Sequence, residues 1–285
     1  MIVLLGGSGF LGKYLIKELQ RNNLNFKTMI HKNDVVDKIK KFRGSVDSNN
    51  YLLENISEDD IVINLTGQID LEDPDFLSNN LRRTLNILNA CKEKKVKQVI
   101  IISSINVYGS RSDASAKETD YLNPETRYGL AKQNTEEICE QYSKEFELNI
   151  VVLRLSLLYG IGQTSGLMGN IQKSVNSNTA ITISHNGEQY RDFLFVEDAA
   201  KSIIHVIKIP QEGFSIFNIS SGKAHKINTV VKIIEKIIRK KIKVNYSSLA
   251  LDEKYICADN LKAKKILNFQ INTDFKTGLE LIFSK

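Results

Sequence analysis

The chain has 285 residues, of which 42% are hydrophobic and 25% charged, so it can bury a sizeable core and is not a disordered chain. Its 3 prolines and its lack of tryptophan exclude a proline-rich or collagen-like protein. The net charge of +6, from 39 basic and 33 acidic residues, is small for this length and favours an anionic ligand without indicating a nucleic-acid partner.

The sequence carries no signal for export, a membrane or a metal. The start, Met1–Leu5, lacks the basic residues and the apolar run of about 7–15 residues of a secretory signal. No stretch approaches the ~20 apolar residues of a membrane span. The 3 cysteines are far apart and without CxxC spacing, so neither a disulfide framework nor a zinc site is predicted. We expect a cytoplasmic protein with no membrane partner and no metal.

Short apolar strands alternate with helical patterns in the first half of the chain. The predicted strands are Ile2–Leu5, Phe26–Ile30, Ile61–Leu65, Val99–Ile102 and Ile150–Leu155. Helical patterns follow the first strand and cover about 76–94 and 128–144. Continuous β-branched strands between helices are typical of a parallel sheet with helices on both faces, so the predicted class is α/β.

The second half is less regular. Residues 160–178 break the alternation, after which strands are predicted near Phe193–Val196 and Phe214–Ile219. Helices are predicted at Val230–Ile238 and Asn260–Leu267. We expect residues 1–160 to form the main domain, with segments returning to it near 193–219, and residues 161–285 to form mostly a smaller lobe.

A glycine-rich turn follows the first strand. The segment Gly6-Gly7-Ser8-Gly9-Phe10-Leu11-Gly12 fits GxGxxG and GxxGxxG and leads into the first helix. Glycines there permit a tight turn, let the backbone approach a pyrophosphate and let the helix pack against the strand. Free N–H groups at the helix start then face the phosphates. The turn predicts a dinucleotide site in a Rossmann doubly wound sheet.

The end of the second strand bears on the choice of dinucleotide. NAD sites place a carboxylate about 20 residues after the glycines, to hold the ribose hydroxyls. Here the strand ends in Ile30-His31-Lys32, where no carboxylate stands. His31 and Lys32 could instead meet a 2′-phosphate, so NADP(H) is favoured and NAD(H) remains possible.

Tyr128 and Lys132 form a YxxxK pair at the start of a predicted helix. Residues four apart share a helical face, so both can meet the same ligand. A phenol with a pKa near 10 is a poor proton carrier at neutral pH. A cation about 4 Å away could lower that pKa by up to roughly 3 units before desolvation opposes it. We therefore expect Lys132 to make Tyr128 a usable acid and base.

With these motifs the chain resembles the extended short-chain dehydrogenases/reductases, and among them the NAD-dependent epimerase/dehydratase family. The matching segments run from end to end: the glycine turn at 6–12, Ser104 with Val107-Tyr108-Gly109, the Tyr128–Lys132 pair, Arg154–Gly160, the stretch 187–198 that resembles the one closing on a nucleotide sugar, and 259–264. The resemblance implies a Rossmann domain, a C-terminal substrate-binding lobe and a homodimer built on the helices near 80–94 and 128–144.

The resemblance also implies roles for individual residues. Ser104, Tyr128 and Lys132 would be catalytic: Ser104 would hydrogen-bond the reacting sugar oxygen, Tyr128 would pass the proton, and Lys132 would bind the nicotinamide ribose. Asn80 would support the site from below, and Arg191 would hold the substrate pyrophosphate, as its planar fork of donors suits phosphate. The cofactor would contact Gly6, Ser8, Gly9, Phe10, Leu11, Gly12, Leu65, Thr66 and Gly67, besides His31, Lys32, Tyr128 and Lys132.

Several reactions remain open. Dehydratases of the family carry an Asp-Glu pair after the serine, where this chain has Ile105-Asn106, so dehydration is disfavoured. The compact second lobe and the basic strand end favour an NAD(P)H-dependent reductase of a nucleotide 4-keto-6-deoxy sugar. The alternative is a nucleotide-sugar 4-epimerase with tightly held NAD. A reductase of small carbonyl compounds and a non-catalytic dinucleotide-binding module are less favoured.

Overall fold

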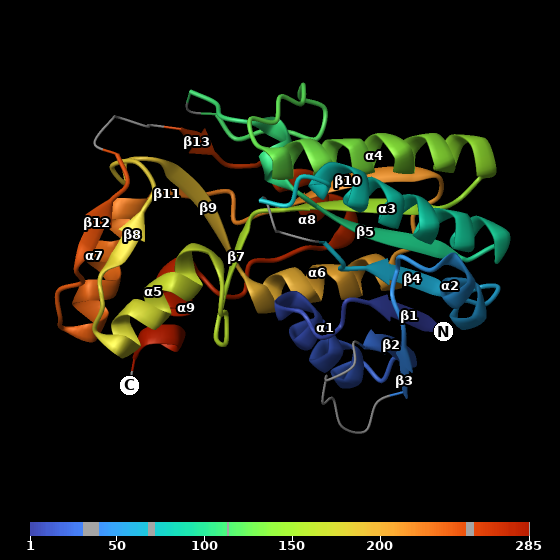
Figure 1. The fold of residues 1–285 in the computed structure, drawn as a ribbon, viewed down its shortest axis with the longest axis horizontal. Coiled ribbons are helices and arrows are strands. Elements are labelled where there is room, and N and C mark those ends of the chain that lie inside the picture. The colour runs from blue at the N-terminus through green and yellow to red at the C-terminus, as the bar shows by residue number, and fades with distance from the viewer. Residues whose placement is uncertain (31–39, 68–71, 113, 249–253, 285) are drawn as a thin grey trace.

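A computed structural model describes residues 1–30, 40–67, 72–112, 114–248 and 254–284. Its centre is a seven-stranded sheet with the strand order β10-β6-β5-β4-β1-β2-β3, in which all neighbouring strands are parallel (Figure 1). The strands are β1 (Ile2–Leu5), β2 (Phe26–Ile30), β3 (Lys40–Arg43), β4 (Ile61–Asn64), β5 (Gln98–Ser104), β6 (Ile150–Leu155) and β10 (Phe214–Ile219).

Helices cover both faces of this sheet. Helices α1 (Phe10–Arg21) and α6 (Val196–Lys208) pack together on one face, and α2 (Asn49–Asn55), α3 (Phe76–Glu93) and α4 (Arg127–Phe146) cover the other (Figure 1). Side chains of a strand point alternately to its two faces. Ile2 and Leu4 accordingly join the core under α1 and α6, whereas Val3 and Leu5 join the core under α3 and α4.

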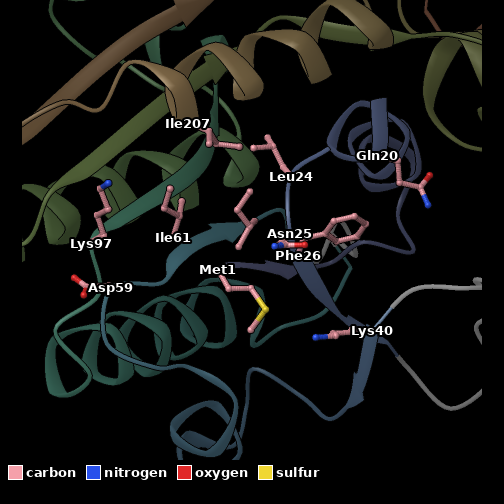
Figure 2. A pocket seen from close by; sticks show the side chains of 11 residues that line it. Met1, Gln20, Leu24, Asn25, Phe26, Lys40, Asp59, Ile61, Lys97 and Ile207 are labelled. Carbon is pink, nitrogen blue, oxygen red and sulfur yellow. The ribbon is translucent and has the colours of Figure 1, made fainter. Parts of the chain in front are cut away.

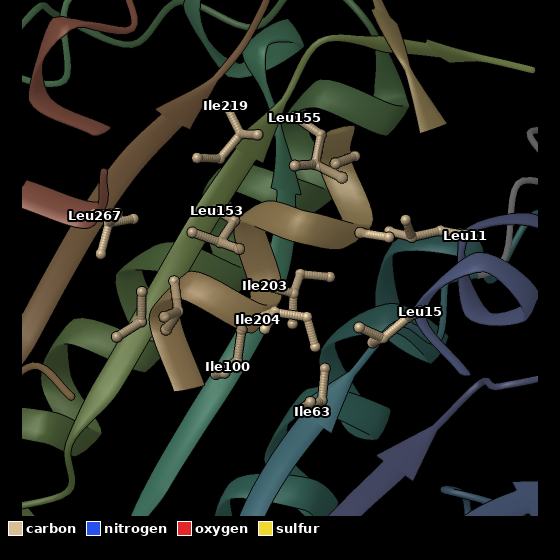
Figure 3. Close-up of a cluster of buried hydrophobic side chains, with 14 of the residues drawn as sticks. Leu11, Leu15, Ile63, Ile100, Leu153, Leu155, Ile203, Ile204, Ile219 and Leu267 are labelled. Atoms are coloured by element: carbon tan, nitrogen blue, oxygen red, sulfur yellow. The ribbon is translucent and has the colours of Figure 1, made fainter. Parts of the chain in front are cut away.

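Helix α6 carries much of the first core. Ile203 and Ile204 point from it toward Leu153 and Ile100 of the sheet and toward Leu15 of α1 (Figure 3). All five side chains are at most 4% exposed. Burying a Leu or Ile side chain stabilises a fold by about 1.5–3 kcal/mol, so this layer holds the glycine turn before α1 firmly against the sheet.

The C-terminal part of the chain builds a smaller unit beside the main sheet (Figure 1). It contains a four-stranded sheet in which β9 (Tyr190–Phe195) pairs with β7 (Leu157–Tyr159), β11 (Ala224–Lys226) and β13 (Tyr255–Ile256). Strands β8 (Ile181–Ile183) and β12 (Val244–Tyr246) form a parallel pair. Three helices complete this unit: α5 (Gly166–Ser177), α7 (Ile227–Ile238) and α9 (Phe275–Phe283). Its core includes Tyr159, Phe193 and Val230.

The predicted α/β class and the parallel sheet are confirmed, and β1, β2, β6 and β10 have the predicted bounds. The sequence patterns missed α5 and also α6, whose buried residues span most of its circumference. Helix α8 (Leu261–Leu267) begins one residue later than predicted. The division at residue 160 stays a prediction, because β10, α6 and α8 from the second half pack on the main sheet. Within the described residues, no helix is both long and apolar enough to cross a membrane.

Candidate active site

The glycine turn between β1 and α1 meets the end of β4. Strand order reverses between β1 and β4, and ligands of open α/β sheets bind at the carboxyl ends of strands at such a switch point. Gly6 has φ +90°, and a Cβ there would lie 3.0 Å from the carbonyl carbon of Leu65. A Cβ on Gly12 would lie only 2.5 Å from the carbonyl oxygen of Gly6. The turn therefore requires glycine at both positions.

The start of α1 is shaped for an anion. The helix begins at Phe10, and its N-cap residue is Gly9, which has no side chain to cap the first N–H groups. The first N–H groups of a helix lack partners within the helix and lie at the positive end of its dipole. The predicted contacts Ser8, Phe10 and Leu11 lie in this same segment. The turn thus fits the pyrophosphate of a dinucleotide.

The residues that follow β4 form the other side of the candidate cofactor site. The Thr66 amide and hydroxyl both donate hydrogen bonds to Asn64 Oδ1, at 2.9 Å and 2.5 Å. These bonds fix the backbone from Leu65 to Gly67 directly beside Gly6, whose Cα faces the amide nitrogen of Thr66. Leu65, Thr66 and Gly67 therefore lie where the resemblance predicts cofactor contacts.

Ser104 is the last residue of β5 and is 7% exposed. Its Oγ accepts a hydrogen bond from the amide of Asn106 at 3.2 Å and so caps the short 3₁₀ helix Ile105–Tyr108. This cap turns the chain sharply after the strand and fixes the Ser104 hydroxyl at the carboxyl edge of the sheet.

Helix α4 brings Tyr128 and Lys132 to the same place. Thr126 caps the helix by accepting a hydrogen bond from the Gly129 amide at 3.0 Å, so Tyr128 lies in the first turn. A Cβ on Gly129 would lie 2.7 Å from the carbonyl oxygen of Asn106. Glycine at this position therefore lets α4 approach the 3₁₀ helix closely enough for Tyr128 to reach Ser104.

The electrostatics of this pair differ from the expectation. Burial raises the pKa of Tyr128 above its ordinary value, and a hydrogen bond from Ser104 opposes the rise. Burial also lowers the pKa of Lys132 to about 8, although the Glu136 carboxylate opposes this fall. The Lys132 ammonium donates to the Ile102 carbonyl oxygen at 2.9 Å and lies 5.7 Å from the centroid of the Tyr128 ring. The expected net lowering of the Tyr128 pKa is wrong, because removing water from a phenolate costs more free energy than the Ser104 hydrogen bond returns.

Asn80 lies below the site on α3. Its amide donates to the Phe76 carbonyl oxygen at 2.7 Å, and Asn80 lines a small cavity together with Thr66, Gly67 and Lys132. The structure therefore brings Asn80 close to the predicted catalytic lysine.

Arg191 lies in a different sheet from the residues above. It belongs to β9, and its Nη1 donates to the carbonyl oxygens of Tyr190 at 2.7 Å and of Lys254 at 3.3 Å. Its predicted contact with a substrate pyrophosphate stays a prediction. His31 and Lys32, on which the NADP(H) preference depends, lie outside the described residues.

A separate hollow of about 670 Å³ opens at the opposite edge of the sheet (Figure 2). It is lined at the amino ends of strands by Ile2, Phe26 and Ile61, with Lys40 and Lys97 beside them. The glycine turn, Thr66 and Ser104 lie at the carboxyl ends of the strands, so this hollow is not part of the candidate active site.

Sequence reasoning missed Glu136, which follows Lys132 by one helical turn and forms a buried ion pair with Arg154. Its spacing of four from Lys132 was the available signal, since such residues share a helical face. The partner could not be read from spacing, because Arg154 comes from β6, 18 residues further along the chain.

Comparisons with known proteins agree with this geometry. An uncharacterised UDP-glucose epimerase of Bacillus subtilis, YtcB, is 26% identical over 98% of this chain and 95% of its own length. The UDP-glucuronate 4-epimerase of Thermodesulfobacterium geofontis is 29% identical over 72% of this chain and 64% of its own length.

Solved structures give the same result for the fold. MoeE5, solved with UDP-glucuronic acid and NAD, superposes with a TM-score of 0.90 at 25% identity, covering 99% of this chain and 97% of MoeE5. The UDP-glucuronic acid 4-epimerase of Bacillus cereus, also solved with NAD, has a TM-score of 0.89 at 24% identity, with 99% and 97% of the two chains covered. Both contain NAD, so the comparisons do not support the preference for NADP(H).

The model of the NAD dependent epimerase/dehydratase family matches residues 2–220. This range includes the glycine turn, Ser104, Tyr128, Lys132 and Arg191, and it covers most of the chain. The chain is therefore an enzyme of the NAD-dependent epimerase/dehydratase family, within the extended short-chain dehydrogenases/reductases.

Proposed function

We propose that this protein is an NAD-dependent 4-epimerase of a UDP-sugar. One observation carries the proposal: Ser104, Tyr128 and Lys132 meet at the carboxyl end of β5, beside a glycine turn that fits a dinucleotide. These residues can move a proton to and from one sugar hydroxyl while that carbon is oxidised and reduced. The UDP-sugar epimerases among the relatives, at 26–29% identity, support this choice over the reductase.

The residues after Ser104 argue against loss of water. Ile105 is apolar and 3% exposed, and Asn106 carries an amide that is neither an acid nor a base at neutral pH. Eliminating water from a sugar needs one group to take a proton from carbon and another to give one to the departing hydroxyl. The chain has no carboxylate at these two positions, so we do not assign it the dehydratase reaction of some relatives.

NAD as the cofactor fits epimerisation. An epimerase returns the hydride it takes, so it needs no external reductant, and the structures of MoeE5 and of the Bacillus cereus epimerase both contain NAD. The glycine turn and α1 would hold the pyrophosphate, Thr66 and Gly67 would line the cofactor, and Lys132 would donate to the nicotinamide ribose. NAD would supply the acceptor and donor of the sugar C4 hydride, and its positive charge would favour the ionised form of Tyr128.

The chain's own residues handle the proton and the orientation of the sugar. Ser104 donates a hydrogen bond to the sugar O4, and the Tyr128 oxygen takes the O4 proton as C4 is oxidised. After the 4-keto sugar has presented its other face, Tyr128 returns the same proton to O4. A positioned acid and base of this kind contributes about 10²–10⁴-fold to the rate.

Arg191 and the dimer complete the proposal. Arg191 would turn its guanidinium from the backbone carbonyl oxygens of Tyr190 and Lys254 to the UDP pyrophosphate, because a charged acceptor binds more strongly than a neutral carbonyl. We further propose a homodimer through α3 and α4, which light scattering tests directly.

The test is an assay of purified protein with UDP-glucose, UDP-glucuronic acid and UDP-N-acetylglucosamine, with products identified by chromatography and NMR. The released cofactor is identified in parallel. We expect a C4 epimer without net change in nicotinamide absorbance, formed about 10²–10⁴-fold more slowly by Tyr128→Phe. Stoichiometric oxidation of NADPH by a nucleotide 4-keto sugar, included in the same panel, would establish the reductase instead. Inactivity on every sugar would contradict the proposal.

A further inference from the structure

A buried ion pair lies directly behind the candidate active site. Arg154 Nη2 of β6 lies 2.6 Å from Glu136 Oε2 of α4, and both side chains are 3% exposed. The Arg154 Nε also contacts both carboxylate oxygens at 3.1 Å. Burying two charges costs free energy that only a well-formed geometry offsets, and hydrophobic residues of similar size often stabilise a fold equally well. The pair therefore calls for an explanation other than stability.

The pair extends into a network whose residues come from α4, β5, β6, β10 and the 3₁₀ helix Ile105–Tyr108. Ser103 of β5 donates its hydroxyl hydrogen to Glu136 Oε1. Arg154 Nη1 donates to the Tyr108 hydroxyl at 2.7 Å, and Tyr108 donates to Asn218 Oδ1 of β10 at 2.7 Å. We call these five residues the Glu136 network. It ties α4 to β5, β6 and β10 next to Ser104.

Three successive turns of α4 meet the last three residues of β5. Tyr128 meets Ser104, Lys132 donates to the Ile102 carbonyl oxygen, and Glu136 accepts from Ser103. Residues spaced by four lie above one another on a helix, so these contacts form one continuous seam. Of these three contacts, that of Glu136 with Ser103 joins two side chains outside the catalytic set. It can therefore hold α4 against β5 without taking part in the reaction.

We propose that Glu136, held by Arg154, is a positioning residue: it sets α4 against β5 so that Tyr128 and Lys132 reach the substrate and cofactor. Its carboxylate, one helical turn from Lys132, also favours the charged form of the Lys132 ammonium. The proposal rests on the role given to Lys132 in the proposed function. The seam supplies the geometry, and the charge of Glu136 supplies the second effect.

The charges around Lys132 support the second effect. Glu136 and Cys139 of α4 act electrostatically on Lys132, the centroid of the Tyr128 ring lies 5.7 Å from its ammonium, and Arg83 of α3 lines the same small cavity. Burial raises the pKa of both Tyr128 and Cys139, which keeps them neutral. Arg83 is paired with Asp47 at 3.0 Å. Among these groups Glu136 is the carboxylate, and removing it lowers the pKa of Lys132 below its present value of about 8.

The variant must not leave Arg154 as an unpaired buried charge, since that alone costs several kilocalories of stability and can unfold the chain. The Glu136→Gln/Arg154→Met double variant removes both charges and roughly keeps the volumes of the two side chains. The control is Asp198→Asn: this carboxylate is fully buried in α6, on the other face of the sheet, where it accepts hydrogen bonds from the amides of Asn272 and Thr273.

The experiment measures the affinity for NAD by calorimetry from pH 6 to 9.5 for the wild-type protein and the two variants, with thermal unfolding as the check on folding. We expect the wild-type affinity to fall as the pH rises through about 8, where Lys132 loses its proton. In the double variant this midpoint should move to lower pH, because Glu136 raises the pKa of Lys132 whereas Arg154 is not among the groups that shift it. The control should lose thermal stability and keep the wild-type midpoint.

If the NAD affinity of the double variant falls by the same factor at every pH, and the midpoint of its pH dependence is unmoved, the Glu136 network is merely structural. That result would overturn the proposal. A midpoint that moves equally in Asp198→Asn would overturn it as well. Binding of NAD needs no sugar, so a moved midpoint in a protein that epimerises none of the sugars would refute the proposed function while supporting the role of Glu136. A protein that epimerises a sugar but shows an unmoved midpoint would support the proposed function and refute the role of Glu136.

Discussion

Replacing Gly129 by alanine tests how the fold places Tyr128. An alanine Cβ would lie 2.7 Å from the Asn106 carbonyl oxygen and 2.9 Å from Pro124 Cβ, where ordinary contacts begin near 3.4 Å. Both neighbours belong to the segments that flank the site, and the nearest atom is backbone, which cannot swing aside. The start of α4 must therefore retreat from the 3₁₀ helix by about 0.7 Å, the difference between those distances.

Tyr128 moves with the start of the helix, away from Ser104. A misplacement of about 1 Å can reduce a rate about 10²-fold, so we expect kcat to fall about ten- to a hundredfold. Stability should change less: overpacking costs about 1–3 kcal/mol, and the better helix propensity of alanine returns about 1 kcal/mol. NAD affinity should fall only slightly, because the glycine turn and the end of β4 are untouched.

The assay compares kcat, NAD affinity and unfolding midpoint for Gly129→Ala and for Gly278→Ala. At position 278, in α9 of the smaller unit, a Cβ would lie 2.2 Å from the hydroxyl of the fully buried Tyr159, so that variant is destabilised far from Tyr128. It should keep a near-normal kcat at a temperature where it remains folded. A Gly129→Ala enzyme with kcat within twofold of wild type would refute the argument that this close approach places the tyrosine.

Four further predictions follow from the site. Gly12→Ala, whose Cβ would lie 2.5 Å and 2.6 Å from the carbonyl oxygens of Gly6 and Gly7, should weaken NAD binding at least about tenfold in calorimetry, since neither backbone group can yield. Tyr128→Phe should keep bound NAD and lower kcat about 10²–10⁴-fold; a near-normal rate would exclude Tyr128 as the proton carrier. Because the pKa of Lys132 is about 8, kcat/KM should fall as the pH rises through that value, and a rate that stays flat to pH 9.5 would contradict a role for the charged ammonium. Arg191→Met should raise KM for the UDP-sugar about ten- to a hundredfold in initial-rate measurements, with NAD affinity unchanged; an unchanged KM would remove Arg191 from the substrate site.

Local patterns predicted most strands of the main sheet in the first half of the chain, although not β3 or α2. The strand Ile2–Leu5 is a continuous apolar run, the turn after it needs glycines, and the helix after that shows leucines at helical spacing. Each signal lies within a few residues, so the sequence predicts a dinucleotide-binding sheet without any tertiary information. The Tyr128–Lys132 pair is visible for the same reason, since spacing by four defines a helical face.

Helix α6 was missed although its apolar residues, from Val196, Ala199 and Ala200 to Ile203, Ile204 and Ile207, form a one-sided helical stripe. Local patterns failed where the surroundings of a side chain decide its chemistry. The pKa of Tyr128 is raised rather than lowered, because desolvation depends on how completely the fold surrounds a group, which spacing does not express.

What the sequence determined by itself is therefore the family, the glycine turn and the spacing of Tyr128 and Lys132, the residues proposed to handle the proton. The tertiary structure decided how those residues are held. Gly129 matters because Asn106, 23 positions earlier, passes next to it, and Glu136 matters because Arg154 and Ser103 arrive from two other strands. Contacts between segments distant in the chain depend on strand order and helix packing, and these are properties of the whole fold that no local spacing encodes.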